Sequence, residues 1–224
     1  MADPPAPFAF VGCHELRENL GRRAFDEREL MEALEQVPAG SVGHHVLGGL
    51  LRHRHAIGPY VNDFASWVAL HVRDQVLGER LAALDPFDCA DVERLREGLI
   101  SIIHDHLSRL PVVPRVVYGA PFCFVQSHLA EVPTMQEART LVDFRNGLAE
   151  VDASALYYHI VEARLRGGRT TSDFAAWLRD ALGRPDLAEQ VERVDVYFLS
   201  LERVRAQILT ILDSALATDL VVGA

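Results

Sequence analysis

The sequence predicts a mainly α-helical protein in which a helical unit occurs twice in tandem, with a pseudo-two-fold axis and a small antiparallel β-sheet where the copies meet. The chain has two tryptophans, and both stand in the same setting, at residues 62–68 and 172–178. Phenylalanine, tryptophan and an aliphatic residue recur there at helical spacing. Aromatic residues alternate with small ones near the start of each copy, which is typical of a half-buried strand.

The elements of the two copies follow one another in the same order. Each copy is predicted to begin with a strand, at residues 7–14 and 121–128. A helix start with a capping-box pattern follows, at 26–29 in the first copy and 134–137 in the second. A second helix then carries His45 in the first copy and His159 in the second, and each ends in a basic run.

Helix starts and apolar faces complete each copy. Asn62 and Ser172 are predicted N-caps, and the aspartates that follow them suit the positive end of a helix. The last helix of each copy has one apolar face, formed by Val92, Leu95, Leu99, Ile102, Ile103 and His106 or by Leu201, Val204, Ile208, Ile211, Leu212 and Ala215.

The domain boundaries follow from this matching. Residues 1–6 are expected to be disordered, residues 7–113 to form the first copy and residues 114–224 the second. No Ser/Gly-rich linker separates the copies, so we expect one compact body. Residues 116–118 and 122–125 flank a tight turn and are expected to form a hairpin in the sheet.

Composition excludes several classes of protein. The net charge is −10 and the pI is about 5.4, which argues against nucleic acid or an anionic membrane as the main partner. The sequence has no apolar run long enough to cross a membrane, and the N-terminus lacks the features of a secretion signal. Three scattered cysteines fit reduced thiols, and we expect a cytoplasmic protein.

Histidines provide the first candidate site. His45 or His159, with Glu162 one helical turn beyond His159, could offer two metal ligands on one helix face. Tyr158, beside His159, is a further candidate ligand-binding residue. The competing interpretation is a packed histidine hydrogen-bonded to a backbone group, and the apolar neighbours of His159 favour it.

Arginines provide the second candidate site. Arg52 and Arg54 in the first copy, and Arg166 and Arg169 in the second, precede helix starts and could bind a phosphate or carboxylate. The competing interpretation is that they complement the negative end of the preceding helix. Nucleophilic catalysis finds little support, because the chain has no nucleophile elbow and no glycine-rich phosphate loop. Cys13 and Cys123 are expected to be inert packing thiols.

Several segments resemble an uncharacterised bacterial family of unknown function. They lie at residues 14–18, 58–64 (Gly-Pro-Tyr-x-Asn-Asp-Phe), 84–87, 113–117, 126–128 and 157–159. The resemblance covers nearly the whole chain, and it implies no catalytic residue. Gly43 and His44 depart from the family pattern, which puts a symmetric two-site function in doubt.

These observations predict a non-enzymatic binding or scaffolding protein that recognises a partner protein or a small anionic ligand between the two copies. The alternative is a metal-dependent or acid–base enzyme that uses the helices of His45 and His159 with Asp63, Asp173 and Glu162. The sequence identifies no cofactor. It leaves open whether a metal is bound and whether the protein is a homodimer.

Overall fold

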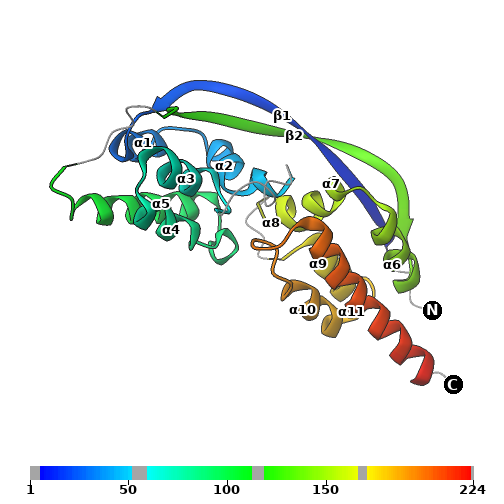
Figure 1. Ribbon diagram of the computed structural model, residues 1–224. Coiled ribbons are helices and arrows are strands. Elements are labelled where there is room, and N and C mark those ends of the chain that lie inside the picture. Colours follow the sequence, from blue (N-terminus) through cyan, green and yellow to red (C-terminus); the bar gives the residue numbers. More distant parts are fainter. Residues whose placement is uncertain (1–5, 52–59, 113–118, 166–170, 223–224) are drawn as a thin grey trace. The chain divides into compact units, whose positions relative to one another are not determined.

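The computed structural model describes residues 6–51, 60–112, 119–165 and 171–222. The elements in Figure 1 are β1 (Phe8–Ala24), α1 (Glu27–Leu34), α2 (Ala39–Leu51), α3 (Asp63–Trp67), the π-helix η2 (Val68–Val72), α4 (Gln75–Ala82), the 3-10 helix η3 (Pro86–Asp88), α5 (Val92–Leu107), β2 (Phe122–Ala138), α6 (Leu141–Glu150), α7 (Ala153–Leu156), the π-helix η4 (Tyr157–Glu162), α8 (Ala163–Leu165), α9 (Asp173–Asp180), α10 (Pro185–Glu192) and α11 (Leu201–Val222). Helices dominate this part of the chain. β1 and β2 pair in opposite directions in a two-stranded sheet.

The chain divides into two compact units, and one of them is built from two separate segments. Unit 1 comprises Met1–His14 and Ala130–Ala224, and unit 2 comprises Glu15–Leu129. The boundaries fall inside both strands. The start of β1 therefore belongs with helices α6 to α11, whereas the start of β2 belongs with helices α1 to α5.

The predicted fold class is wrong in its arrangement, although helices do dominate. A tandem repeat would place each strand start with the helices that follow it in sequence, but each strand start belongs with the helices of the other half. An antiparallel sheet of two strands is present, but its strands are longer than predicted, since β1 and β2 are each 17 residues long and pass from one unit into the other. Alternating burial can be read from sequence, but it does not say which helices cover the buried face.

Aromatic side chains at the strand starts explain these attachments. In unit 1 the Phe8 ring lies 5.4 Å from that of Phe144 and 5.5 Å from that of Phe174. In unit 2 the Phe122 ring stacks on that of Phe64, with 5.0 Å between centroids. These rings are buried, and aromatic pairs at such separations add to the free energy gained by burial.

Helix caps hold the start of each central helix, as the sequence predicts. The Asn62 side chain accepts a hydrogen bond from the Ala65 amide at 2.8 Å, and Ser172 does the same for Ala175 at 3.2 Å. The helix start predicted at 134–137 is wrong, because these residues belong to β2. The cap lies instead at Thr140, which forms a reciprocal capping box with Asp143.

Parts of the remaining predictions lie outside the described residues. They are the disordered segment, of which 1–5 are not described, and the hairpin strand at 116–118. The division of the sequence into 7–113 and 114–224 as one compact body stays a prediction.

Candidate functional site

A pocket of about 290 Å³ lies in unit 2, beside α3 and the start of β2. It is lined by His45, Asp63, Ser66, Trp67, Leu70, His71, Pro121, Phe122 and Cys123. These residues come from α2, α3, η2 and β2 and the residue before it, so the pocket depends on segments far apart in the sequence.

The tryptophan of α3 fixes the wall of this pocket. Trp67 is 5% exposed, and its Nε1–H donates a hydrogen bond of 2.8 Å to the Ala120 carbonyl oxygen. Its ring lies 5.7 Å from that of Phe122. The segment before β2 is therefore attached to α3 by both a polar and an aromatic contact.

A π-helical segment follows Trp67 and carries two lining residues. η2 includes Leu70 and His71, which are both exposed, and it ends at Arg73, where φ is +69°. π-helical segments are rare and often occur at functional sites. In unit 1 the helix that contains Trp177 stays α-helical to Asp180.

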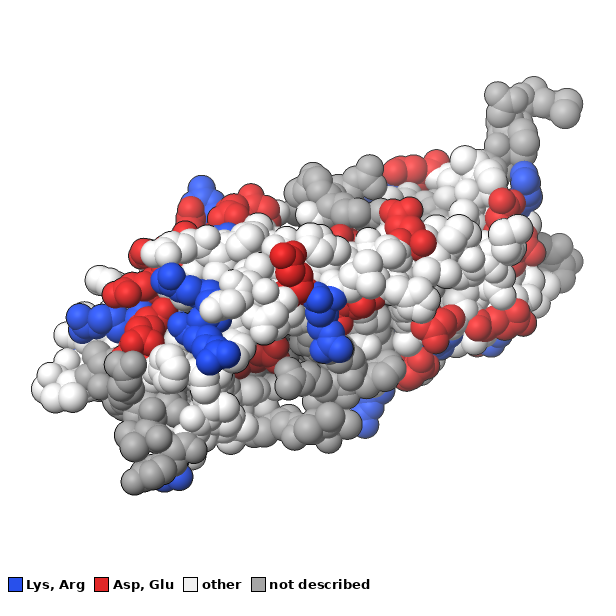
Figure 2. All heavy atoms as spheres, turned by 90° about the horizontal axis from the view of Figure 1, so that it is seen from above, with Lys and Arg blue, Asp and Glu red and all other residues white. Residues whose placement is uncertain are grey.

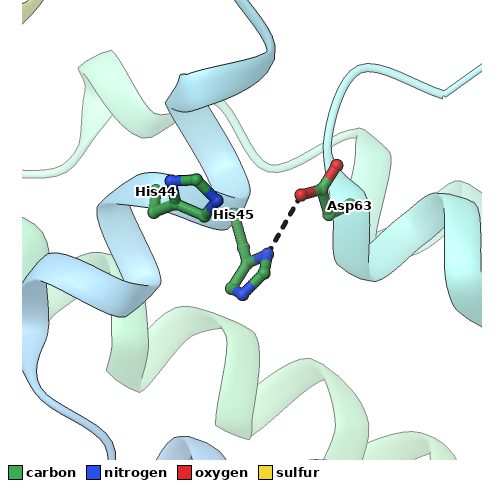
Figure 3. Close-up of side chains that lie close together, drawn as sticks. All are labelled: His44, His45 and Asp63. Carbon is green, nitrogen blue, oxygen red and sulfur yellow. Dashed lines mark hydrogen bonds and ion pairs between the residues drawn. The ribbon is translucent and has the colours of Figure 1, made fainter. Parts of the chain in front are cut away.

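His45 lines the pocket, and both of its ring nitrogens are engaged. Nδ1 is 3.0 Å from Asp63 Oδ2 (Figure 3). The Val125 amide donates to Nε2 at 3.0 Å. A backbone N–H can only donate, so Nε2 carries no hydrogen and Nδ1 donates to the carboxylate. The ring therefore joins the start of α3 to β2.

His159 makes the same set of bonds in unit 1. Its Nδ1 is 3.0 Å from Asp173 Oδ2, and its Nε2 accepts a hydrogen bond of 2.9 Å from the Val11 amide. Both histidines are about 4% exposed. This agrees with the packed-histidine interpretation, with an amide N–H as the backbone partner.

These contacts limit what either histidine can do chemically. A general base needs a free nitrogen near the proton that it removes, but Nε2 of each ring already accepts a backbone hydrogen bond. A metal bound through either nitrogen would break the bond to the strand or the bond to the aspartate. The His–Asp pairs therefore hold helices to strands.

His44, His45 and Asp63 of unit 2 each offer a potential metal-ligand atom, and these atoms all lie within 4.8 Å of one another. His44 Nδ1 is 2.9 Å from Glu15 Oε1, and the His44 and His45 rings meet edge to face at 4.9 Å. Figure 3 shows the His45 ring directed at Asp63, with His44 beside it. Because His45 holds the strand amide and Asp63, this group is organised around hydrogen bonds between side chains.

Three polar residues of the pocket wall have alanine counterparts in unit 1. Ser66 precedes Trp67, as Ala176 precedes Trp177. Cys123 follows the first phenylalanine of β2, as Ala9 follows that of β1. The same fold contacts are thus made in unit 1 without a hydroxyl or a thiol at these places.

His71 is the third of these residues. It lies one helical turn beyond Trp67, where unit 1 has Ala181 beyond Trp177. The Ala120 amide donates to His71 Nδ1 at 3.3 Å, so in the neutral ring Nε2 carries the hydrogen and is a donor.

The other predicted site residues do not gather at this pocket. Tyr158 is buried, and its hydroxyl donates to Glu131. Glu162 ends η4, and the metal-ligand groups found among the described residues include neither His159 nor Glu162. Arg52, Arg54, Arg166 and Arg169 lie outside the described residues.

Sequence reasoning missed Ser66 and His71 and treated Cys123 as inert packing, yet Cys123 is exposed and lines the pocket. A signal was present, because each of these three residues stands where the matched segment has alanine. Their convergence could not be predicted without knowing that β2 starts in unit 2.

The surface charge does not form a large basic area on the face in Figure 2. There, acidic side chains are spread over the surface, and basic ones lie in small groups beside them. Among the described helices, none combines the length and the apolar character needed to cross a membrane.

Comparisons with known proteins place the chain in a family. The chain is similar to a solved structure, OrfY from Thermoproteus tenax, with a TM-score of 0.81 and 27% sequence identity over 94% of this chain and 95% of that one. No curated protein matches the chain. The model of a family of unknown function, DUF5752, matches residues 5–213. The chain therefore belongs to this family of unknown function.

Proposed function

We propose that this protein is a non-enzymatic binding protein and that the pocket of unit 2 takes a small hydrogen-bonding ligand. The observation that carries the proposal is the polar wall formed by Ser66, His71 and Cys123, which unit 1 replaces with alanines. Unit 1 folds with alanine at these three places, which supports a ligand as the reason for the polar side chains in unit 2.

The shape and chemistry of the pocket support a small molecule. A volume of about 290 Å³ is near the lower end for ligand pockets. Trp67 and Phe122 offer aromatic surface, Ser66 offers a hydroxyl, and His71 offers a ring N–H. A small anion would accept hydrogen bonds from Ser66 and His71, whereas the nearby Asp63 carboxylate favours neutral or cationic ligands.

The engagement of His45 supports binding over catalysis. The pocket contains a histidine–aspartate pair, which would be the natural acid–base element of an enzyme, but its Nε2 accepts the Val125 amide. A partner protein is the competing occupant, and it would need a contact surface much larger than this pocket.

The proposal is tested by screening the purified full chain against neutral, anionic and cationic metabolites with ligand-observed NMR. The variant Ser66→Ala/His71→Ala/Cys123→Ala gives unit 2 the residues of unit 1. We expect it to keep its melting temperature and to weaken binding at least about tenfold, the effect of losing one or two hydrogen bonds.

The matched control places the polar residues in unit 1 instead, as Ala9→Cys/Ala176→Ser/Ala181→His, and it should bind as the wild type does. Wild-type affinity in the unit 2 triple variant would contradict the proposal. Turnover of a bound metabolite would contradict its non-enzymatic part.

A further inference from the structure

A second polar cluster lies in unit 2, formed by Glu27, Asp74 and His106. Glu27 opens α1, Asp74 is the N-cap of α4, and His106 lies in the last turn of α5. Each residue offers a potential metal-ligand atom, and these atoms all lie within 4.8 Å of one another. The pocket described above uses none of these residues.

Glu27 is the unusual member of the cluster. It is 0% exposed, and neither of its carboxylate oxygens has a hydrogen-bond partner. A buried carboxylate without partners is strongly unfavourable, and native proteins compensate it with a bound proton, a pairing cation or a metal ion. The described structure supplies no such group for Glu27.

The side chains of Asp74 and His106 meet each other beside Glu27. Asp74 Oδ1 accepts the Leu77 amide at 2.8 Å, which fixes the side chain at the start of α4. Its Oδ2 is 2.7 Å from His106 Nε2. The side chains of His106 and Asp74 are 11% and 15% exposed, so the cluster lies just below the surface and an ion can enter past them.

Unit 1 shows that the helices do not need this cluster. Leu141 stands at the first position of α6, Arg184 at the N-cap of α10, and Ala215 at the place in α11 that His106 occupies in α5. None of these residues is a carboxylate or a histidine. Packing alone therefore does not account for this cluster of ionisable side chains in unit 2.

We propose that Glu27, Asp74 and His106 bind a divalent transition-metal ion, and that this ion ties the starts of α1 and α4 to the end of α5. One imidazole and two carboxylates form a donor set that suits Zn²⁺, Mn²⁺, Co²⁺ or Ni²⁺. Ca²⁺ and Mg²⁺ fit less well, because they prefer six or more oxygen ligands.

Binding requires small movements. Ligand atoms that share an ion at about 2.0–2.2 Å lie about 3–3.5 Å apart, so the three side chains must draw together by about an ångström. His106 must exchange its hydrogen bond to Asp74 for the ion, with its ring hydrogen on Nδ1. The positive charge then offsets the charge of both carboxylates.

The test uses the full chain, purified without a histidine tag and stripped with a chelator. Titration with ZnCl₂, MnCl₂ and CaCl₂ is followed by calorimetry and by metal analysis after dialysis. We expect one equivalent of Zn²⁺ or Mn²⁺ per chain, a higher melting temperature with the metal, and no comparable response to Ca²⁺.

Two variants assign the site. Asp74→Asn keeps an N-cap side chain, and His106→Ala introduces the residue that unit 1 has; each should weaken metal binding at least about 100-fold while the chain stays folded. Asp63→Asn alters the His44, His45 and Asp63 group and should leave this binding unchanged.

A chain that binds neither Zn²⁺ nor Mn²⁺ would overturn the proposal. So would binding that both variants retain, or binding that only Asp63→Asn removes. Glu27→Gln should weaken metal binding in the same way, and if that variant fails to fold, Asp74→Asn and His106→Ala still decide the outcome.

Discussion

The Glu27 carboxyl group should make stability depend on pH in an unusual direction. Burial, together with the repulsion from the nearby Asp74 and Asp26 carboxylates, raises its pKa from 4.5 to about 7. Between these two values the folded chain holds a proton that the unfolded chain has released. The free energy of unfolding should therefore fall as pH rises from about 4.5 to 7.

Glu27→Gln tests this in chelator-treated protein, because glutamine cannot ionise. Relative to this variant, the wild type should lose about 1–3 kcal/mol of stability between pH 4.5 and pH 8, measured by urea denaturation. Glu32→Gln, at an exposed position of the same helix, is the control and should show no such difference. A pH-independent difference between wild type and Glu27→Gln would show that the carboxylate is ionised in the folded state.

The histidine that joins a strand to a helix should matter for stability. His159→Ala removes the acceptor of the Val11 amide and one hydrogen bond to Asp173 in a partly buried setting, so we expect a loss of about 2–4 kcal/mol. His128→Ala changes an exposed side chain and should cost less than about 0.5 kcal/mol. Guanidinium denaturation measures both. Equal stabilities for the two variants would contradict the role given to His159.

Helix α6 has a glycine, Gly147, where the helix lies close to the Phe10 ring. A Cβ added at Gly147 would lie 2.5 Å from Cε2 of Phe10, whose ring is buried against that of Phe144. The Phe10 ring cannot move away without losing its packing. The start of β1 therefore leaves no room for a side chain at position 147 of the helix.

Gly147→Ala should therefore destabilise the protein by about 1–3 kcal/mol, although alanine favours helices. Gly43→Ala is the matched control, because an added Cβ there meets nothing within 4 Å. It should stabilise by up to about 1 kcal/mol. Thermal denaturation compares the two, and a stabilising Gly147→Ala would show that Phe10 does not pack on α6.

Local signals in the sequence predicted elements well where the deciding contacts are local. Asn62 and Ser172 cap their helices because the acceptor and the amide lie within one turn. The same reasoning failed at 134–137, because these residues pair with β1. Thr134 Oγ1 donates a hydrogen bond of 2.6 Å to the Phe10 carbonyl oxygen and does not cap a helix.

The arrangement of the whole chain depends on contacts that sequence periodicity does not contain. Alternating phenylalanines predicted strands at 7–14 and 121–128, but the hydrogen bond from the Val11 amide to His159 decides where the first strand packs. That bond joins residues far apart in sequence. The tandem arrangement was therefore a natural prediction and a wrong one.

The candidate sites were predictable only in part for the same reason. The sequence proposes His45 as a ligand-binding residue, and the structure places it in the lining of the pocket, whereas its bond to Asp63 depends on how α2 meets α3. Glu27, Asp74 and His106 come from three helices, and each alone resembles an ordinary helix-end or helix-face residue. Only their packing in unit 2 brings them together.

The unit on which each strand start packs can be determined by fluorescence, because each unit contains one tryptophan. Trp177 in unit 1 lies 5.7 Å from the Phe8 ring, and Trp67 in unit 2 lies 5.7 Å from the Phe122 ring. Trp67→Phe leaves a reporter of unit 1, and Trp177→Phe leaves a reporter of unit 2.

Acrylamide quenching of these single-tryptophan proteins tests the assignment of the strand starts in native buffer. Adding Phe8→Ala should increase quenching of Trp177 and leave Trp67 unchanged, whereas Phe122→Ala should increase quenching of Trp67 alone. If Phe8→Ala exposes Trp67 instead, the first strand packs on the helices that follow it in sequence, and the assignment of strand starts to units is wrong.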